Sequence, residues 1–248
     1  MNTQVLIRGI EHTIKTKEEH EYFLIHVARY AHILNTITTI AEPEKKLRVL
    51  DVGCFPYHLG TALESMGYDV YGIASGHEPI KNKNISVINI EKDRFPHKDG
   101  FFDFVIFTEV LEHIPQSPLL ALKEMARVTK PGGHLILTTP NIARSINRGM
   151  LAMGKSIMYP VDNLLENEGR GSTIYMRHNR EYTMDELKRL VSSAGWTVAE
   201  SEYFVSYTPF RKRTRQDRPL LWFGKFVNYL AMEIVPSFRD TLLVVGGK

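Results

Sequence analysis

Cysteine is almost absent from this sequence, because Cys54 is the single one among 248 residues. One cysteine forms no disulfide within a chain, and such sequences are typical of reducing compartments. No apolar run reaches the roughly 18 residues that a membrane-spanning helix needs. The first residues also lack the apolar core of a secretory signal. These absences predict a cytoplasmic protein.

Neither sign of charge is in large excess. The formal net charge is only +3, which gives no general basic surface of the kind that binds nucleic acids. A nucleic-acid partner is therefore not expected. The sequence also contains no internal repeat and no low-complexity segment.

The sequence does contain the ordinary material of a folded domain. Hydrophobic residues make up 43% and charged residues 24%, which is enough to bury a core without disulfides. We expect one domain over residues 1–248, with additions at three places. They are an N-terminal helical cap at 1–46, a lid or substrate insertion at 141–182, and a basic-aromatic insertion at 206–240 before the last strand.

Apolar runs and helical patterns alternate along the chain. Strands are expected at 47–52, 69–73, 85–90, 101–108, 134–139, 196–205 and 241–245. Helices are expected at 18–41, 58–66, 119–129 and 183–194. This alternation predicts an α/β fold: a doubly wound, mostly parallel sheet of seven strands with helices on both faces.

The stretch Val49–Gly60, VLDVGCFPYHLG, joins the first strand to the first helix of the predicted sheet. It contains an acid, Asp51, followed by Gly53. A strand, a glycine-bearing turn and a helix form the ligand crevice of open α/β sheets, at the carboxyl ends of the strands. We therefore expect a bound cofactor at this turn.

Five segments in order resemble the class I S-adenosylmethionine-dependent methyltransferases. They are Val49–Gly60, IEKDRFP at 90–96, FFDFVIFTEVLEHI at 101–114, EMARVTKPGGHLILTTPN at 124–141 and HNREYTMDEL at 178–187. The resemblance implies a Rossmann-like methyltransferase sheet with an antiparallel last strand, and S-adenosyl-L-methionine as cofactor. The first turn departs from the family pattern, since Phe55 and Tyr57 replace glycines. A nicotinamide-binding domain is the alternative, but no G-x-G-x-x-G follows the first strand.

The resemblance also implies where the cofactor binds. The expected cofactor-binding residues are Asp51, Gly53, Cys54, Phe55, Ala74, Ser75, Asn89, Ile90, Glu91 and Thr108. Ala74 replaces the acid that meets the ribose in most relatives, so Ser75 or Glu78 is expected to take that role. Asn89 both donates and accepts hydrogen bonds and therefore suits an adenine edge.

Glu109, Glu112 and His113 follow the fourth predicted strand. In a helical turn their spacing would place them on one face, where they could bind a divalent ion or exchange protons. The E-x-x-E-H pattern resembles the magnesium site of small-RNA 2′-O-methyltransferases and of quinone-biosynthesis O-methyltransferases, with His178 as the further ligand. We predict Glu109, His113 and His178 as catalytic residues and Glu109, Glu112, His113 and His178 as Mg²⁺ ligands. The alternative is local structural roles for these residues, without a metal.

The expected lid is rich in basic and amide residues, namely Arg144, Asn147, Arg148, Arg170, Arg177, His178, Asn179 and Arg180. Two interpretations stay open. The arginines bind an acidic acceptor, or they pair with local acids such as Asp162, Glu166 and Glu168.

A basic cluster, RKRTRQDR at 211–218, precedes an aromatic and apolar stretch that runs to Val235. This combination is typical of a segment that lies in a membrane interface. The alternative is a helix that packs on the sheet or on a second subunit. Peripheral membrane contact through 211–235 and the oligomeric state both stay open.

Together these observations predict an S-adenosylmethionine-dependent O-methyltransferase whose acceptor is a small molecule or glycan with a free hydroxyl, including a lipid-linked intermediate. N-methylation of adenine and C5-methylation of cytosine are not expected, because the N-P-P-Y-like loop and the Pro-Cys loop are missing. The alternatives are a metal-assisted enzyme of the small-RNA or quinone type, or a methyltransferase-like binding protein without activity.

Overall fold

The structure is a computed structural model that describes residues 3–14, 16–42, 45–75, 82, 84–166, 174–175, 177–207 and 219–248. Its centre is a sheet of seven strands in the order β3-β2-β1-β4-β5-β7-β6. The strands are β1 Arg48–Val52, β2 Asp69–Ala74, β3 Ile85–Val87, β4 Phe102–Thr108, β5 Thr129–Pro140, β6 Thr197–Phe204 and β7 Thr241–Gly247. β7 pairs antiparallel with both β5 and β6, and the other pairs are parallel. The predicted mostly parallel sheet with an antiparallel last strand is confirmed.

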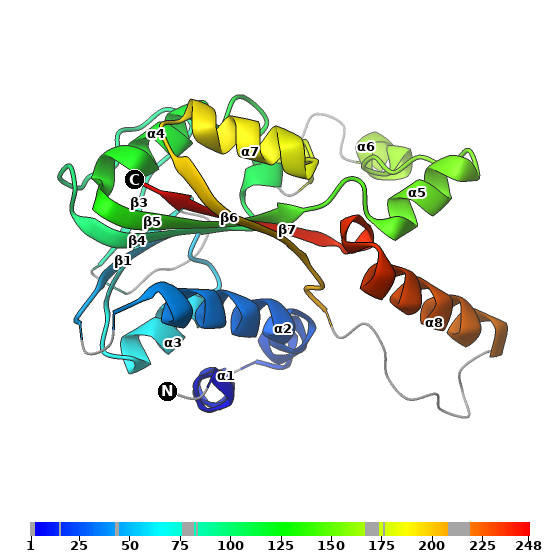
Figure 1. The fold of residues 1–248 in the computed structure, drawn as a ribbon, viewed down its shortest axis with the longest axis horizontal. Helices are drawn as coiled ribbons and strands as arrows, with labels where there is room; N and C mark the ends of the chain where they lie inside the picture. The colour runs from blue at the N-terminus through cyan, green and yellow to red at the C-terminus, as the bar shows by residue number, and fades with distance from the viewer. Residues whose placement is uncertain are drawn as a thin grey trace.

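Helices cover both faces of the sheet (Figure 1). One layer holds α1 Thr3–Glu11, α2 Lys17–Ile40 and α3 His58–Ser65, and the other holds α4 Leu119–Val128 and α7 Met184–Ser193. Each layer encloses its own hydrophobic cluster. Phe23, Ile33 and Ile37 of α2 pack on the first face, while Leu122 and Met125 of α4 pack on the second. The predicted doubly wound arrangement is therefore confirmed, and α1 is an additional helix that the sequence analysis did not identify.

Several strands and loops differ from the predicted boundaries. β3 ends at Val87 rather than at residue 90. β5 begins at Thr129, five residues earlier than predicted, and therefore includes Pro131-Gly132-Gly133, a composition typical of turns. The carboxyl end of the chain explains this extension, because Gly132 N–H donates to Lys248 O and Lys248 N–H donates to Gly133 O. A long-range partner thus keeps an otherwise turn-forming stretch extended.

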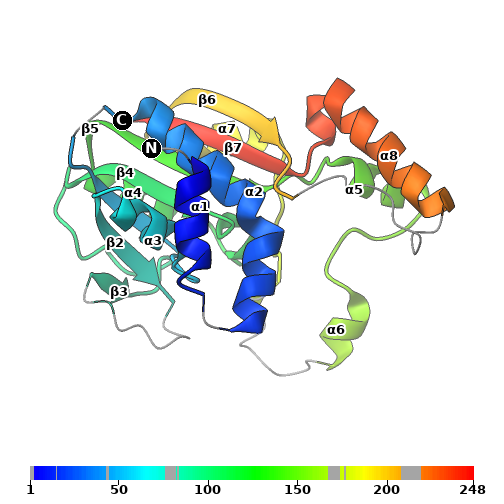
Figure 2. The same cartoon turned by 90° about the horizontal axis from the view of Figure 1, so that it is seen from below.

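The insertion at 141–182 begins and ends beside the sheet. Asn141 and Tyr182 form a parallel bridge, so the two ends of the insertion lie side by side. Between them are α5 Ser145–Ala152 and α6 Val161–Glu166. Both helices project from one end of the sheet, together with α8 Pro219–Ile234 (Figure 2).

α8 packs against α5 and the short 3₁₀ helix η3 Pro236–Phe238. The alternative that this helix packs on the sheet is therefore not supported, and packing on a second subunit stays open. Phe223, Val227, Leu230 and Ile234 of this helix are exposed. Among the described helices, none is long and apolar enough to cross a membrane. The basic residues at 211–218 lie outside the described part of the chain, and contact with a membrane interface stays a prediction.

Gly53, in the turn between β1 and α3, has a φ of +83°. Besides this left-handed conformation, a Cβ at Gly53 would overlap Cγ2 of Val110. Gly67 offers a matched control: its φ is +85°, but a Cβ there would meet no atom within 4 Å. Both glycines therefore have the same conformational requirement, and only Gly53 has a steric one.

We predict that Gly53→Ala lowers the free energy of unfolding by about 1–3 kcal/mol more than Gly67→Ala does, since overpacking adds to the shared conformational cost. Urea unfolding followed by circular dichroism measures both variants. In a Val110→Ala background the excess should disappear. Equal losses for the two single variants would show that Val110 does not restrict this turn.

Candidate functional site

The first turn of the sheet is tied to the second strand. Gly53 N–H and Cys54 N–H both donate to Ile73 O, at 2.8 and 3.2 Å. Cys54 is buried and Phe55 is 57% exposed. The two N–H groups are thus already bonded within the chain, and Phe55 is the side chain at this turn that is open to a ligand.

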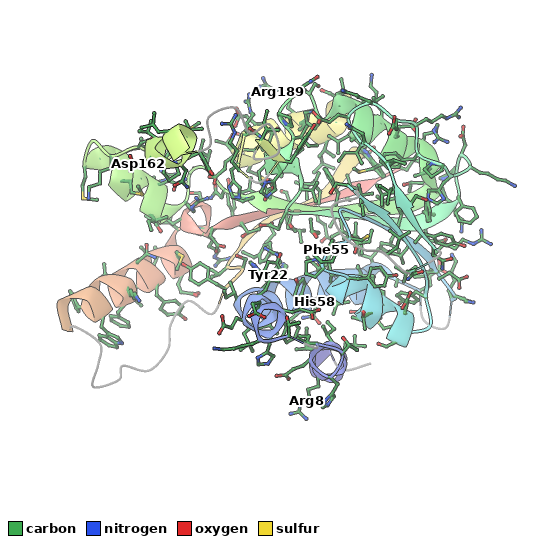
Figure 3. All side chains as sticks on the ribbon, turned by 180° about the vertical axis from the view of Figure 1, so that it is seen from behind. Arg8, Tyr22, Phe55, His58, Asp162 and Arg189 are labelled. Atoms are coloured by element: carbon green, nitrogen blue, oxygen red, sulfur yellow. The ribbon has the colours of Figure 1, made fainter. Side chains whose placement is uncertain are left out.

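Asp51 is 3% exposed, on the sheet face that carries α2 and α3. Burial raises the pKa of its carboxyl to about 7. Phe55 and His58 lie near Tyr22 of α2, as Figure 3 shows. The first turn therefore borders the N-terminal helices as well as the sheet.

No acid stands at the end of β2. Ala74 is buried and its carbonyl accepts from Ile88 N–H, while Ser75 is exposed. Glu78 lies outside the described residues. Ser75 is therefore the described side chain that can meet a ribose hydroxyl here.

The turn after β3 contains the Asn89–Glu91 segment and receives a residue from the insertion. Asn89 Oδ1 accepts from Glu91 N–H at 2.9 Å, and the Asn89 side chain also forms a hydrogen bond with the Tyr175 hydroxyl. Tyr175 Oη donates to Glu91 Oε2 at 2.9 Å. Glu91 Oε1 is buried without a hydrogen-bond partner among the described residues. This turn therefore carries a buried acceptor available for a ligand, and the insertion reaches it. Ile90 is half-buried and packs against the core.

Glu109 and Glu112 lie on opposite faces of the sheet. Thr138 Oγ1 donates to Glu109 Oε1 at 2.9 Å, and Thr139 Oγ1 donates to Glu112 Oε2 at 3.0 Å. Successive side chains of a strand point to opposite faces, so these consecutive threonines separate the two acids. The expectation that Glu109 shares a face with Glu112 and His113 is wrong. The physical reason is local: Glu109 adopts a φ of +54°, and the 3₁₀ helix η1 begins only at Leu111 and ends at His113.

Glu109 instead pairs with Arg29 of α2, which the sequence analysis missed. Arg29 is 6% exposed, and its Nη1 lies 3.2 Å from Glu109 Oε2. Its Nε is buried without a hydrogen-bond partner in the described chain. An arginine among the buried positions of an apolar helix was the one available signal, since buried charges are normally paired or functional. Thr108, at the end of β4, is half-buried beside this pair.

The structure brings Glu112, His113 and His178 together. One ligand atom from each of these residues lies within 4.8 Å of the others. The segment at 177–180 reaches η1 through its backbone, because Glu112 O accepts from Asn179 N–H at 2.7 Å and from Arg180 N–H at 3.2 Å. The Asn179 side-chain amide also donates to His113 O at 2.8 Å. These bonds place His178 beside His113, as the sequence predicted, with ring centroids 5.0 Å apart.

Hydrogen bonds define the tautomer of both histidines. His113 Nδ1 lies 3.1 Å from Arg177 O and His178 Nδ1 lies 2.9 Å from Glu181 Oε1. A carbonyl or carboxylate oxygen only accepts, so each Nδ1 carries the proton and each neutral ring keeps its lone pair on Nε2. This second hydrogen bond is the support that metal-binding and proton-accepting histidines normally have.

Burial controls the charge of this group. Burial raises the pKa of the Glu112 carboxyl well above its usual range, and Glu109 raises it further. Burial, together with nearby His178, lowers the pKa of His113. His113 is therefore neutral at physiological pH, in the form that binds a metal or accepts a proton.

A cavity of about 330 Å³ opens beside His178. Its wall comes entirely from the insertion and combines apolar with basic side chains. The lining residues are Ile142, Arg144, Ile157, Met158, Tyr159, Pro160, Arg177, His178, Asn179, Arg180 and Glu181.

Two of the three cavity arginines have carboxylate partners. Arg144 pairs with Glu181 through both terminal nitrogens, at 2.8 and 3.1 Å, and Arg180 pairs with Glu186 at 2.8 Å. These partners differ from the expected acids. Asp162 lies exposed on the outlying α6 (Figure 3). The Glu166 side chain, Glu168 and Arg170 lie outside the described residues.

The buried carboxyl of Asp51 makes the fold sensitive to pH. Its pKa is about 7 when folded and near 4 when unfolded, so the folded state binds more protons between these values. Stability should then fall as pH rises, by about 1.4 kcal/mol per pH unit up to pH 7. We predict that Asp51→Asn removes this loss and gains about 3 kcal/mol over the wild type between pH 5 and 8.

Chemical unfolding of the cofactor-free protein at several pH values measures this difference. Asp162→Asn is the control, because Asp162 is exposed and its replacement should give a difference that does not change with pH. A constant difference for Asp51→Asn would contradict the prediction.

Comparisons with known proteins agree with this geometry. A family model described as a methyltransferase domain matches residues 21–201. A ubiquinone biosynthesis O-methyltransferase of Rhizobium etli is 26% identical over 206 residues, which cover 79% of this chain and 76% of that protein. Its counterpart in Pectobacterium atrosepticum is 32% identical over 130 residues, 48% of this chain and 53% of that protein, so the chain spans about half of its length.

A solved S-adenosylmethionine-dependent methyltransferase from Archaeoglobus fulgidus shares the fold. The TM-score is 0.58 at 14% identity, with 90% of this chain and 94% of that chain covered. At that identity the likeness concerns the fold alone. The family match over most of the chain, the sheet order and the segments that meet at the carboxyl edge lead to one conclusion: this chain belongs to the class I S-adenosylmethionine-dependent methyltransferases.

Proposed function

We propose that this methyltransferase transfers the methyl group to a hydroxyl oxygen of a small acceptor. The observation that carries the proposal is the group formed by Glu112, His113 and His178 beside the cavity. A hydroxyl is a poor nucleophile at neutral pH and needs a base or a metal, which an amine acceptor needs far less. The names of the Rhizobium and Pectobacterium relatives, both O-methyltransferases, support this choice.

The carboxyl edge of the sheet fits the cofactor. S-adenosylmethionine supplies a methyl group that its positive sulfur activates. Arg29, whose Nε is a buried donor without a partner in the described chain, would bind the methionine carboxylate. Glu91 Oε1, a buried acceptor without a partner in the described chain, would serve the ribose and adenine end, and Phe55 would border the cofactor at the first turn.

His113 and His178 provide the proton acceptor. Each ring carries its hydrogen on Nδ1, so each Nε2 can accept the hydroxyl proton of the acceptor. Glu181 holds the His178 ring through a 2.9 Å hydrogen bond and would stabilise the imidazolium that forms. Positioning of the acceptor and removal of its proton are thus the work of the chain's own side chains.

The same group also fits a divalent cation. Without Glu109 it offers two imidazoles and one carboxylate, which suits manganese, iron or zinc at least as well as the predicted magnesium. Bound there, a cation would occupy the Nε2 lone pairs and would act in place of the two bases, by lowering the pKa of an acceptor hydroxyl. Glu109 stays with Arg29 on the other face and is a positioning residue for the cofactor end of the site.

We predict that His178→Gln lowers kcat for hydroxyl methylation at least 100-fold, the usual contribution of a positioned base. The S-adenosylmethionine-induced rise in melting temperature should stay unchanged. Methyl transfer from labelled cofactor to a panel of catechols, polyols and amines measures the rate. His20→Gln, on an exposed histidine of α2, is the control and should keep full activity. Faster transfer to amines than to hydroxyls would overturn the proposal.

A second prediction concerns the cation. Isothermal titration of the protein with Mn²⁺, Mg²⁺ and Zn²⁺ should show one site that Glu112→Gln abolishes, and chelator-treated wild type should lose hydroxyl methylation. Glu200→Gln, on an exposed residue of β6, should bind as the wild type does. Full activity in chelator, with no heat of binding, would leave His113 and His178 as bases without a metal.

A further inference from the structure

One arginine in the cavity beside His178 has no carboxylate partner in the described chain. We propose that the cavity receives the methyl acceptor and that Arg177 binds a carboxylate that the acceptor carries; this inference rests on the proposed function. The acceptor is then a small hydroxylated acid, with the reacting hydroxyl and the carboxylate on one ring or one short carbon chain.

The three cavity arginines differ in how they are neutralised. Arg144 makes two hydrogen bonds to Glu181, and Arg180 pairs with Glu186. Arg177 has only a neutral partner, since its Nε donates to Asn179 Oδ1 at 3.0 Å. No ion pair within the described chain involves Arg177. Within the described part of the chain, the two terminal nitrogens of Arg177 therefore remain open to an anion.

The position of Arg177 connects the anion site with the histidines. Its carbonyl accepts from His113 Nδ1 at 3.1 Å, and His178 is the next residue in the chain. Both Arg177 and His178 line the cavity. One small ligand can therefore reach the Arg177 guanidinium with its carboxylate and the His178 ring with a hydroxyl.

Size and charge restrict the ligand further. A volume of about 330 Å³ is at the small end of ligand pockets, which favours one ring over an oligosaccharide or a nucleic acid. Ile157, Met158 and Pro160 provide an apolar wall for such a ring. A single unpaired guanidinium matches the single charge of a carboxylate, in the bidentate geometry that arginine favours, better than the double charge of a phosphate monoester.

Binding to the protein saturated with S-adenosylhomocysteine, which has no methyl to transfer, tests the inference. The probes are 3,4-dihydroxybenzoate, its uncharged amide and catechol, measured by isothermal titration. The wild type should bind the acid at least tenfold more tightly than the amide. Arg177→Gln should reduce that ratio to near one. Arg177→Lys keeps the charge but loses the two terminal nitrogens that bind a carboxylate in bidentate geometry, so it should give an intermediate ratio.

Arg148→Gln is the matched control. Arg148 belongs to the same insertion, but its guanidinium lies over the Phe238 ring and does not line the cavity, so the tenfold ratio should persist. Each variant must keep the thermal shift with S-adenosylmethionine, which shows that it is folded. Equal binding of acid and amide to the wild type, no binding of any probe, or an unchanged ratio in Arg177→Gln would each overturn the inference.

Methyl transfer separates this inference from the proposed function. Methylation of catechol and amide without preference for the acid would leave hydroxyl methylation standing and remove the role of Arg177. Selective binding of the acid with no methylated product from any hydroxyl would leave the role of Arg177 standing and would contradict hydroxyl methylation.

Discussion

The site depends on two hydrogen bonds to one carbonyl. Glu112 O accepts from Asn179 N–H and Arg180 N–H, and these bonds attach the end of the insertion to the chain that follows β4. His178 lies beside His113 for this reason, Arg177 O reaches His113 Nδ1, and the cavity acquires its basic wall. A helix-to-helix contact could slide by a turn, whereas backbone bonds to a single carbonyl allow one register. The segment that carries the acceptor pocket is therefore fixed to the segment that carries the reacting groups.

The pleat of β5 divides the site into two chemical halves. Thr138 directs Glu109 toward α2 and Arg29, and Thr139 directs Glu112 toward the opposite face and His113. The half on the α2 side combines an arginine with an acid and suits the zwitterionic end of the cofactor. The other half combines two imidazoles with a buried acid and suits a hydroxyl. Two acids three residues apart can thus serve different ligands, because the strand beside them alternates its side chains between faces.

Local patterns were enough to predict the sheet, because each buried strand is a continuous apolar run and each connecting helix has its own periodicity. The pairing of His113 with His178 also followed from a family pattern in the sequence. Three features depended on distant partners and could not be predicted. β5 begins early because Lys248 bonds to Gly133. Glu109 left the expected group because Arg29 and Thr138 bind it. Arg144 and Arg180 pair with Glu181 and Glu186 rather than with Asp162. Side-chain pairing depends on which residues are neighbours in the folded chain, and this was not available from the sequence.

Two of the three arginines that line the cavity serve the architecture of the site. Arg144 neutralises Glu181, and Glu181 in turn accepts from His178 Nδ1, so this arginine indirectly defines which nitrogen of His178 is free. Arg180 pairs with Glu186, whose side chain also caps α7 through Thr183. A basic sequence is therefore weak evidence for an acidic ligand, because arginines that pair with acids of the same chain must first be left out of the count. Among the three cavity arginines, Arg177 is the one without a carboxylate partner in the described chain. It precedes His178 and lines the same cavity, and its guanidinium, rather than the overall charge, is the argument for an acidic acceptor.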